Sequence, residues 1–151
     1  MAKLTHIDRE GKARMVDVGS KGISVRVARA SGHITMRPGT IDQVKENSMK
    51  KGDVLAVAQI SGITAAKQTS LLIPLCHNIA LDSIHVEAVT DDTGVAVHSE
   101  VRCTGRTGVE MEALTAVSVA LLAVYDMCKA VDKDMIIDYI KLTHKEKHED
   151  S

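Results

Sequence analysis

Two lysines followed by glycine and aspartate, Lys50-Lys51-Gly52-Asp53, stand directly before a stretch with helical periodicity. Free backbone N–H groups at the start of a helix, together with nearby ammonium groups, can bind an anion such as phosphate. The same residues also fit a solvated basic turn in which Asp53 caps the helix. The segment is therefore a candidate anion site or an ordinary helix start.

A second polar segment, Ile73 to Asn78, carries Cys76 and His77 on a loop that Pro74 makes rigid. A cysteine and a histidine that are neighbours in sequence form a nucleophilic pair only if the fold brings their reactive atoms together. Two interpretations stay open. One is a cysteine-dependent hydrolase, which thiol reagents would inactivate, and the other is a buried thiol beside a surface imidazole.

The start of the longest expected helix combines Arg106 and Thr107 with the acidic residues Glu110 and Glu112. Arginine, hydroxyl and helix N–H groups suit an anion, whereas the glutamates also suit the positive end of the helix dipole. The sequence contains neither a P-loop nor a GxGxxG motif, so it lacks a standard nucleotide cradle.

Near the end of the same helix, Asp126 and Lys129 are three residues apart and share one helical face. Such pairs are common on protein surfaces and stabilise a helix by only about 0.2–0.5 kcal/mol. Taken alone, this pair is typical of a solvated helix surface, and acid–base chemistry is the competing interpretation.

The elements that position these residues follow from the hydrophobic pattern. Alternating residues predict strands over 23–36, 81–90, 95–104 and 135–142, the first with a break at Ser31-Gly32. Helical periodicity predicts helices over 41–47, 54–72 and 109–133, with Thr40 as the first N-cap and an interruption at Gly62. The order strand, helices, strand, strand, helix, strand predicts an α+β fold of the ferredoxin-like split βαβ type, a four-stranded antiparallel sheet with helices packed on one face.

We expect a single catalytic domain over residues 1–151, because a chain of this length can bury a sizeable core. Residues 1–22 have mixed charge and several glycines and are expected to form a loose lead-in. Residues 144–151 are expected to be a frayed charged tail.

Composition narrows the classes of partner. The chain has no Trp, no Phe and only two Tyr, and its net charge is −1. Non-specific binding of single-stranded nucleic acid relies on aromatic stacking, and binding of any nucleic acid is favoured by a basic surface. We therefore expect no nucleic-acid partner.

The cysteines and the lengths of the apolar runs indicate the cellular compartment of the protein. Cys76, Cys103 and Cys128 form no CxxC pair, so the sequence predicts a reducing environment rather than a disulfide framework or a zinc site. Residues 1–18 lack a signal-peptide apolar run, and no stretch approaches ~20 uninterrupted apolar residues. We expect a cytoplasmic protein without a membrane partner.

The longest expected helix is apolar on all sides between Leu114 and Val124. A helix of this kind must be covered on every side, and its own sheet covers only one. A second copy of the chain would supply the remaining cover. The competing interpretation is a neutral outward face made of Ala113, Ala116, Ala120 and Ala123.

As a set, five strings resemble the molybdenum cofactor biosynthesis protein C family, the cyclic pyranopterin monophosphate synthases. They are MVDV from Met15, KKGDV from Lys50, IPLCH from Ile73, TGVEMEALTA from Thr107 and YDMCKA from Tyr125. The resemblance runs from Leu4 to about Lys145. The family's glycine- and lysine-rich tail, of the type KSGGKSG, is replaced here by residues 143–148, although Lys145 keeps a lysine at its start.

The resemblance implies a lyase that converts 3′,8-cyclo-7,8-dihydro-GTP to cyclic pyranopterin monophosphate with release of pyrophosphate. It implies a ferredoxin-like fold and a hexamer, a trimer of dimers with sites at the dimer interface. No cofactor and no metal ligand are implied, although Mg²⁺ could accompany the triphosphate. The implied acid–base residues are Lys51, Asp126 and Lys129, and the implied substrate contacts are Leu75, Cys76, His77, Met111, Glu112, Arg26 and Lys145.

These residue types suit the implied chemistry, because opening a purine-derived ring and closing a pyran requires several proton transfers. A lysine acts as a base when burial or neighbouring cations lower its pKa, and Lys51 has Lys50 beside it. Lys129, close to Asp126, fits an acid or an electrostatic partner. Arg26, Arg106 and Lys145 could stabilise the leaving pyrophosphate. A non-catalytic ligand-binding module is the alternative, since this fold hosts many of them.

The positions of Glu112 and Asp126 limit how a site can be built. They lie fourteen residues apart on one expected helix, which corresponds to about 21 Å of rise. Both cannot contact the reacting end of one small ligand unless a second copy, antiparallel about a two-fold axis, completes the site. A triphosphate stretched along the helix would be the alternative.

Overall fold

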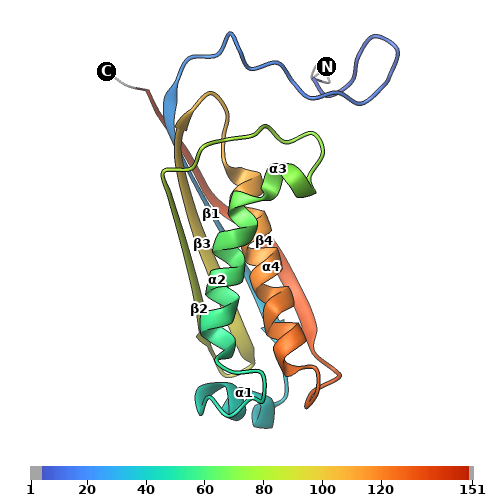
Figure 1. The fold of residues 1–151 in the computed structure, drawn as a ribbon, viewed down its shortest axis with the longest axis vertical. Coiled ribbons are helices and arrows are strands. Elements are labelled where there is room, and N and C mark those ends of the chain that lie inside the picture. Colours follow the sequence, from blue (N-terminus) through green and yellow to red (C-terminus); the bar gives the residue numbers. More distant parts are fainter. Residues whose placement is uncertain (1–4, 150–151) are drawn as a thin grey trace.

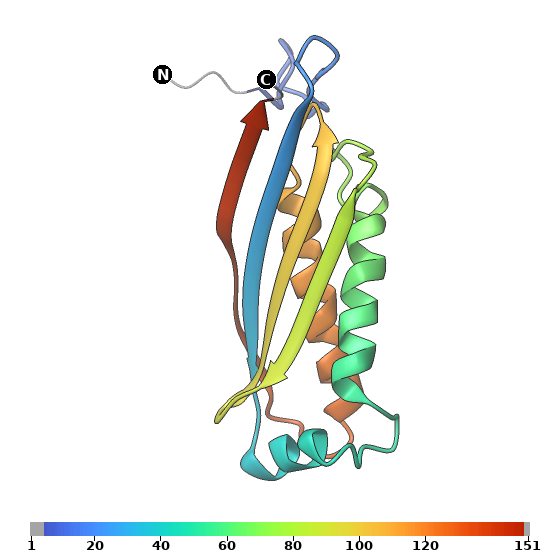
Figure 2. The ribbon, with the colours of Figure 1, turned by 90° about the vertical axis from the view of Figure 1, so that its left-hand side faces the viewer.

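The computed structural model describes residues 5–149 of the chain. Its elements are β1 (Ser24–Thr35), α1 (Pro38–Lys45), α2 (Val54–Lys67), α3 (Thr69–Leu72), β2 (Ser83–Thr90), β3 (Gly94–Gly105), α4 (Glu110–Cys128) and β4 (Ile136–Glu149), as Figure 1 shows. The strands form one antiparallel sheet in the order β2-β3-β1-β4. Helices α2 and α4 cover one face of this sheet (Figure 2). The predicted α+β class and the four-stranded antiparallel sheet are confirmed.

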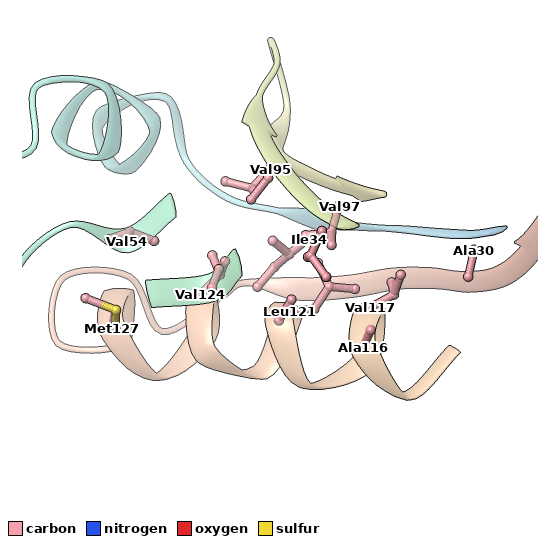
Figure 3. Close-up of a cluster of buried hydrophobic side chains, with 14 of the residues drawn as sticks. Ala30, Ile34, Val54, Val95, Val97, Ala116, Val117, Leu121, Val124 and Met127 are labelled. Carbon is pink, nitrogen blue, oxygen red and sulfur yellow. The ribbon is translucent and has the colours of Figure 1, made fainter. Parts of the chain in front are cut away.

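The core lies between the sheet and the two long helices. Every second residue of β1 faces the helices, and Ala28, Ala30 and Ile34 are at most 1% exposed. They meet the apolar face of α4, where Val117, Leu121 and Val124 are fully buried (Figure 3). Branched aliphatic side chains thus fill a core that contains no Phe or Trp.

Two glycines that were predicted to interrupt elements instead allow close packing. β1 continues through Gly32, where an added Cβ would lie 2.7 Å from side-chain atoms of Leu121 and Val117. α2 continues through Gly62, where a Cβ would lie 2.9 Å from the carbonyl oxygen of Ala116. The predicted breaks at Ser31-Gly32 and at Gly62 are therefore wrong, because the missing side chains let α4 approach β1 and α2.

The start of the first helix also differs from the prediction. α1 begins at Pro38, whose fixed φ suits the first turn of a helix. Thr40 is not the N-cap. It lies inside α1 and its hydroxyl donates to the buried carboxylate of Asp132, 2.9 Å away. The same carboxylate accepts from the backbone N–H of Arg37, so Asp132 ties the start of α1 to the segment after α4.

The helix that ends at Cys128 is shorter than predicted, because the next residues turn towards β4. The N–H groups of Val131 and Asp132 both donate to the carbonyl of Cys128 and close this turn. α4 is long and apolar enough to cross a membrane by length and composition alone. In this fold it is a core helix that packs against α2 and against one face of the sheet.

The charged tail is not frayed over its described part. β4 extends to Glu149, and its ladder with β1 runs as far as the pair Ser24 and Glu149. Backbone N–H and C=O groups at the edge of β1 pair with the backbone of these residues, whatever charge their side chains carry. The charged side chains therefore wrongly indicated a frayed tail. Along the strand, the carboxylate of Glu146 lies between two imidazoles, 3.1 Å from Nε2 of His144 and 3.3 Å from Nε2 of His148.

A histidine on the uncovered face of the sheet joins three parts of the fold. His33 is 8% exposed, and its ring nitrogens lie 2.5 Å from a carboxylate oxygen of Asp138 and 3.0 Å from one of Asp91. Asp138 lies at a register shift between β1 and β4, and Asp91 lies in the turn between β2 and β3. Burial would lower the pKa of His33, but its hydrogen bonds and the charges of Asp138 and Asp91 outweigh burial and raise it.

We expect His33→Gln to destabilise the fold by about 1–2 kcal/mol near pH 5–6, because two facing carboxylates lose their cation. Since the folded-state pKa of His33 is raised, its contribution is complete below its unfolded pKa and is lost as the pH rises through the folded value. Urea unfolding of both proteins from pH 5 to pH 9 measures this difference. The exposed His98 supplies the matched control, His98→Gln. A destabilisation by His33→Gln that does not change with pH would contradict the ionic role.

Candidate functional site

Three residues predicted to transfer protons meet at one end of the helical layer. The ammonium of Lys51 lies 3.0 Å from one carboxylate oxygen of Asp126, and the ammonium of Lys129 lies 3.0 Å from the other. Lys51 also donates to the Asp126 carbonyl, at 3.1 Å. The loop between α1 and α2 supplies Lys51, and the last turn of α4 supplies Asp126. The fold thus forms a triad of two lysines and one carboxylate, called here the lysine half.

Electrostatics keep the carboxylate of the lysine half ionised. Hydrogen bonds from Lys51 and then Lys129, with the charges of both, lower the pKa of Asp126 below its ordinary value. All three side chains are about half exposed, so a ligand could reach them. A lysine acting as a base here would first have to leave its ion pair with Asp126.

The turn before α2 is a capped helix start. Asp53 accepts a hydrogen bond from the N–H of Ala56 at 3.0 Å, which confirms the interpretation of Asp53 as N-cap. Gly52 has a φ of +110°, a conformation that favours glycine and that turns the chain between Lys51 and Asp53. Anion binding at this turn stays a prediction.

A second group of predicted residues lines a depression of about 150 Å³ at the opposite end of α4. We call this end the substrate half. The loop after α3 supplies Leu75, Cys76 and His77, and the first turn of α4 supplies Met111 and Glu112. The fold therefore brings together two short segments that are more than thirty residues apart in sequence. Thr107, Gly108, Glu110, Ile79 and His6 line the same depression.

Glu112 has the least ordinary environment in the substrate half. It is only 4% exposed, and within the described part of the chain its Oε2 atom has no hydrogen-bond partner. Burial, assisted by the charge of Glu110, raises the pKa of Glu112 although its backbone N–H acts in the opposite direction. A buried polar atom without a partner is costly, so it is a strong candidate for a ligand contact.

Cys76 is not set up as a nucleophile. It is partly buried, and burial together with the charge of Glu112 raises the pKa of its thiol. Nucleophilic cysteines are instead activated by a lowered pKa or by an apposed base. The Nε2 atom of the neighbouring His77 donates to the carbonyl of Val16. These contacts favour Cys76 as pocket lining over the cysteine-dependent hydrolase.

The predicted phosphate contacts lie at the same end as the substrate half. Arg26, on β1, donates to the carbonyl of Arg106 at 3.4 Å, and Lys145, on β4, forms a 3.0 Å ion pair with Glu110. Arg26 also lines a hollow of about 400 Å³ with Lys21 and Lys147, two cations that the sequence reasoning missed. The strand pairing of Arg26 with Lys147 could have revealed the second only if the tail had been recognised as a strand.

Within one chain, the lysine half and the substrate half lie far apart. Glu112 and Asp126 occupy the first and last turns of the same helix, which places them about 21 Å apart along its axis. In Figure 1 the last turn of α4 lies at the end of the molecule that carries α1, whereas its first turn lies at the end that carries α3. The reacting end of one small ligand therefore cannot contact both halves of the same chain, unless the ligand is extended along the helix. Over residues 5–149, no group of three or more His, Cys, Asp or Glu side chains is arranged to hold a metal ion.

Comparisons with known proteins give one consistent result. A family model described as the MoaC family matches residues 15–148. A protein of Chloroflexus aggregans is 55% identical over 145 residues, covering 95% of this chain and 88% of the relative. Proteins of Novosphingobium aromaticivorans, 55% identical with 96% and 92% covered, and of Brevibacillus brevis, 52% identical with 95% and 90% covered, are similar too. All three carry the name cyclic pyranopterin monophosphate synthase.

Proposed function

The chain belongs to the MoaC family, and we propose that it forms its active site between two copies of itself. It is a lyase of molybdenum cofactor biosynthesis, a cyclic pyranopterin monophosphate synthase acting on a cyclised GTP derivative with release of pyrophosphate. The observation that carries the proposal is the separation of the lysine half from the substrate half on α4.

A two-fold axis near the middle of α4 would join the halves. The midpoint between Glu112 and Asp126 is Val119. If a second copy of α4 runs antiparallel across this point, each substrate half faces the lysine half of the other copy. One pairing would then create two equivalent sites.

Exposed apolar side chains on the helical layer support this interface. Leu122 is 56% exposed on α4, Ile60 is 65% exposed on α2, and Met111 is 38% exposed at the start of α4. Fully burying a side chain of this kind contributes about 1.5–3 kcal/mol. Ser118, near the proposed axis, is small and already bonds to the carbonyl of Leu114, so it leaves room for close approach.

We assign different roles in the reaction to the residues of the two halves. Lys51 and Lys129 would move protons during ring opening and pyran formation, while ionised Asp126 holds both ammonium groups in place. Arg26, Lys145 and Arg106 would neutralise the triphosphate and stabilise the leaving pyrophosphate. Leu75, Cys76, His77, Met111 and Glu112 would bind the base and the ring system.

The remaining features of the proposal follow from the family. We expect a cytoplasmic hexamer, a trimer of dimers, without a bound cofactor, because proton transfers alone can accomplish this rearrangement. If Mg²⁺ takes part, it would enter with the triphosphate and lie near Arg26 and Lys145 rather than at the lysine half.

Incubation of the purified protein with 3′,8-cyclo-7,8-dihydro-GTP tests the activity. We expect equal amounts of pyrophosphate and of a pterin product, measured by coupled phosphate release and by fluorescence after oxidation. GTP itself is the control substrate and should give neither. Binding of the cyclised derivative without turnover would instead support the non-catalytic ligand-binding module.

A further inference from the structure

The lead-in forms a closed hairpin before the first strand. The N–H of Arg14 donates to the carbonyl of His6 at 3.0 Å, and Ile7 bridges to Ala13. The side chain of Asp8 accepts from the N–H groups of Glu10 and Lys12, both at 2.9 Å. These bonds are local, so the hairpin over residues 5–14 holds its own shape without a hydrophobic core.

The chain after the hairpin is tied to the substrate half. The imidazole of His77 donates to the carbonyl of Val16, a contact across 61 residues of sequence. Val18 and His77 line one hollow of about 280 Å³ together with Arg106 and Thr107. Figure 1 shows residues 5–22 at the same end of the molecule as α3.

The hairpin contributes one side chain to the substrate half. His6 lines the depression that contains Cys76, His77 and Glu112. An imidazole can donate to a phosphate or to a polar group of a base, and it can accept from an amino group. None of the residues 5–14 lies within the segment that the family model matches, which begins at Met15.

We propose that residues 5–18 are a strap that closes over the substrate half, and that His6 contacts the bound cyclised GTP derivative. The proposal rests on the function proposed above. The His77–Val16 bond holds one end of the strap to the site, and the self-bonded hairpin carries His6 to its rim. Closure of this kind excludes water and orders a flexible triphosphate substrate.

Steady-state kinetics test the contact. We expect His6→Ala to raise KM for 3′,8-cyclo-7,8-dihydro-GTP about tenfold and to change kcat by less than about threefold. The reason is that loss of one hydrogen bond to a charged group weakens binding by about tenfold. A chain that begins at Met15 should show a KM raised at least as much, with an unchanged circular dichroism spectrum. His85→Ala, an exposed histidine on β2, is the matched control and should keep both constants.

Limited proteolysis tests closure independently of turnover. Arg9, Lys12 and Arg14 are exposed trypsin sites within the strap. In Lys129→Ala, which should not consume the ligand, saturating cyclised GTP derivative should slow cleavage at these sites at least about fivefold. Turnover of the cyclised GTP derivative by the wild-type protein tests the proposed function independently of the strap. A wild-type KM in His6→Ala, or cleavage that the ligand does not slow, overturns the strap even if the enzyme is active.

Discussion

Replacing Lys51 or Lys129 by Ala is expected to lower turnover by about 10²–10⁴-fold, the usual contribution of a positioned proton-transfer group. Both ammonium groups lie 3.0 Å from Asp126 and are half exposed, so they are held in place yet open to a ligand. Stopped assays of pyrophosphate release measure the effect. Because exposed ion pairs stabilise a protein by only about 0–1 kcal/mol, the fold and the oligomer should survive either change.

A matched control variant distinguishes the loss of a proton-transfer group from the loss of one positive charge on the surface. Lys45 is an exposed lysine in the last turn of α1, outside the lysine half, and Lys45→Ala removes an identical charge. It should retain turnover within about threefold and the same thermal midpoint. Wild-type turnover in both Lys51→Ala and Lys129→Ala would remove the lysine half from the mechanism.

Much of the fold could be predicted because strands and helices alternate clearly in the sequence. The strands predicted over 81–90 and 95–104 and the order of the elements are examples, and both are present in the structure. The roles of Gly32 and Gly62 could not be predicted, since a glycine that breaks an element and a glycine that lets a helix approach look alike in one sequence. Their meaning depends on Leu121, Val117 and Ala116, which lie far away in the chain.

The candidate site, too, could be predicted from the sequence only in part. The pairing of Asp126 with Lys129 follows from helical spacing, whereas the contact of Lys51 with Asp126 spans 75 residues and came only from the family resemblance. Lys147 was missed because its charged surroundings indicated a frayed tail rather than a strand. His6 was missed because nothing local to the lead-in shows that it returns to the loop carrying His77.

Subunit complementation is the second expected result. In Glu112→Ala the substrate half is damaged, and in Lys129→Ala the lysine half is damaged, so each variant should be inactive alone. If sites are shared across a two-fold axis, a mixed dimer has one site with both defects and one intact site. Random pairing gives half mixed dimers, so about a quarter of wild-type activity should return.

The control uses two variants with defects in the same half. Lys51 and Lys129 contact the same carboxylate of the same chain, so every site in a Lys51→Ala and Lys129→Ala mixture retains one defect. This mixture should stay inactive under conditions that restore the first one. Mass spectrometry of isotopically labelled chains verifies that subunits exchange in both mixtures.

The activity of the remixed Glu112→Ala and Lys129→Ala chains tests the shared site most directly. We expect recovery to about a quarter of wild-type turnover, with no recovery in the same-half control. Complete subunit exchange without any recovery of activity would contradict it, and would mean that the two halves act within one chain.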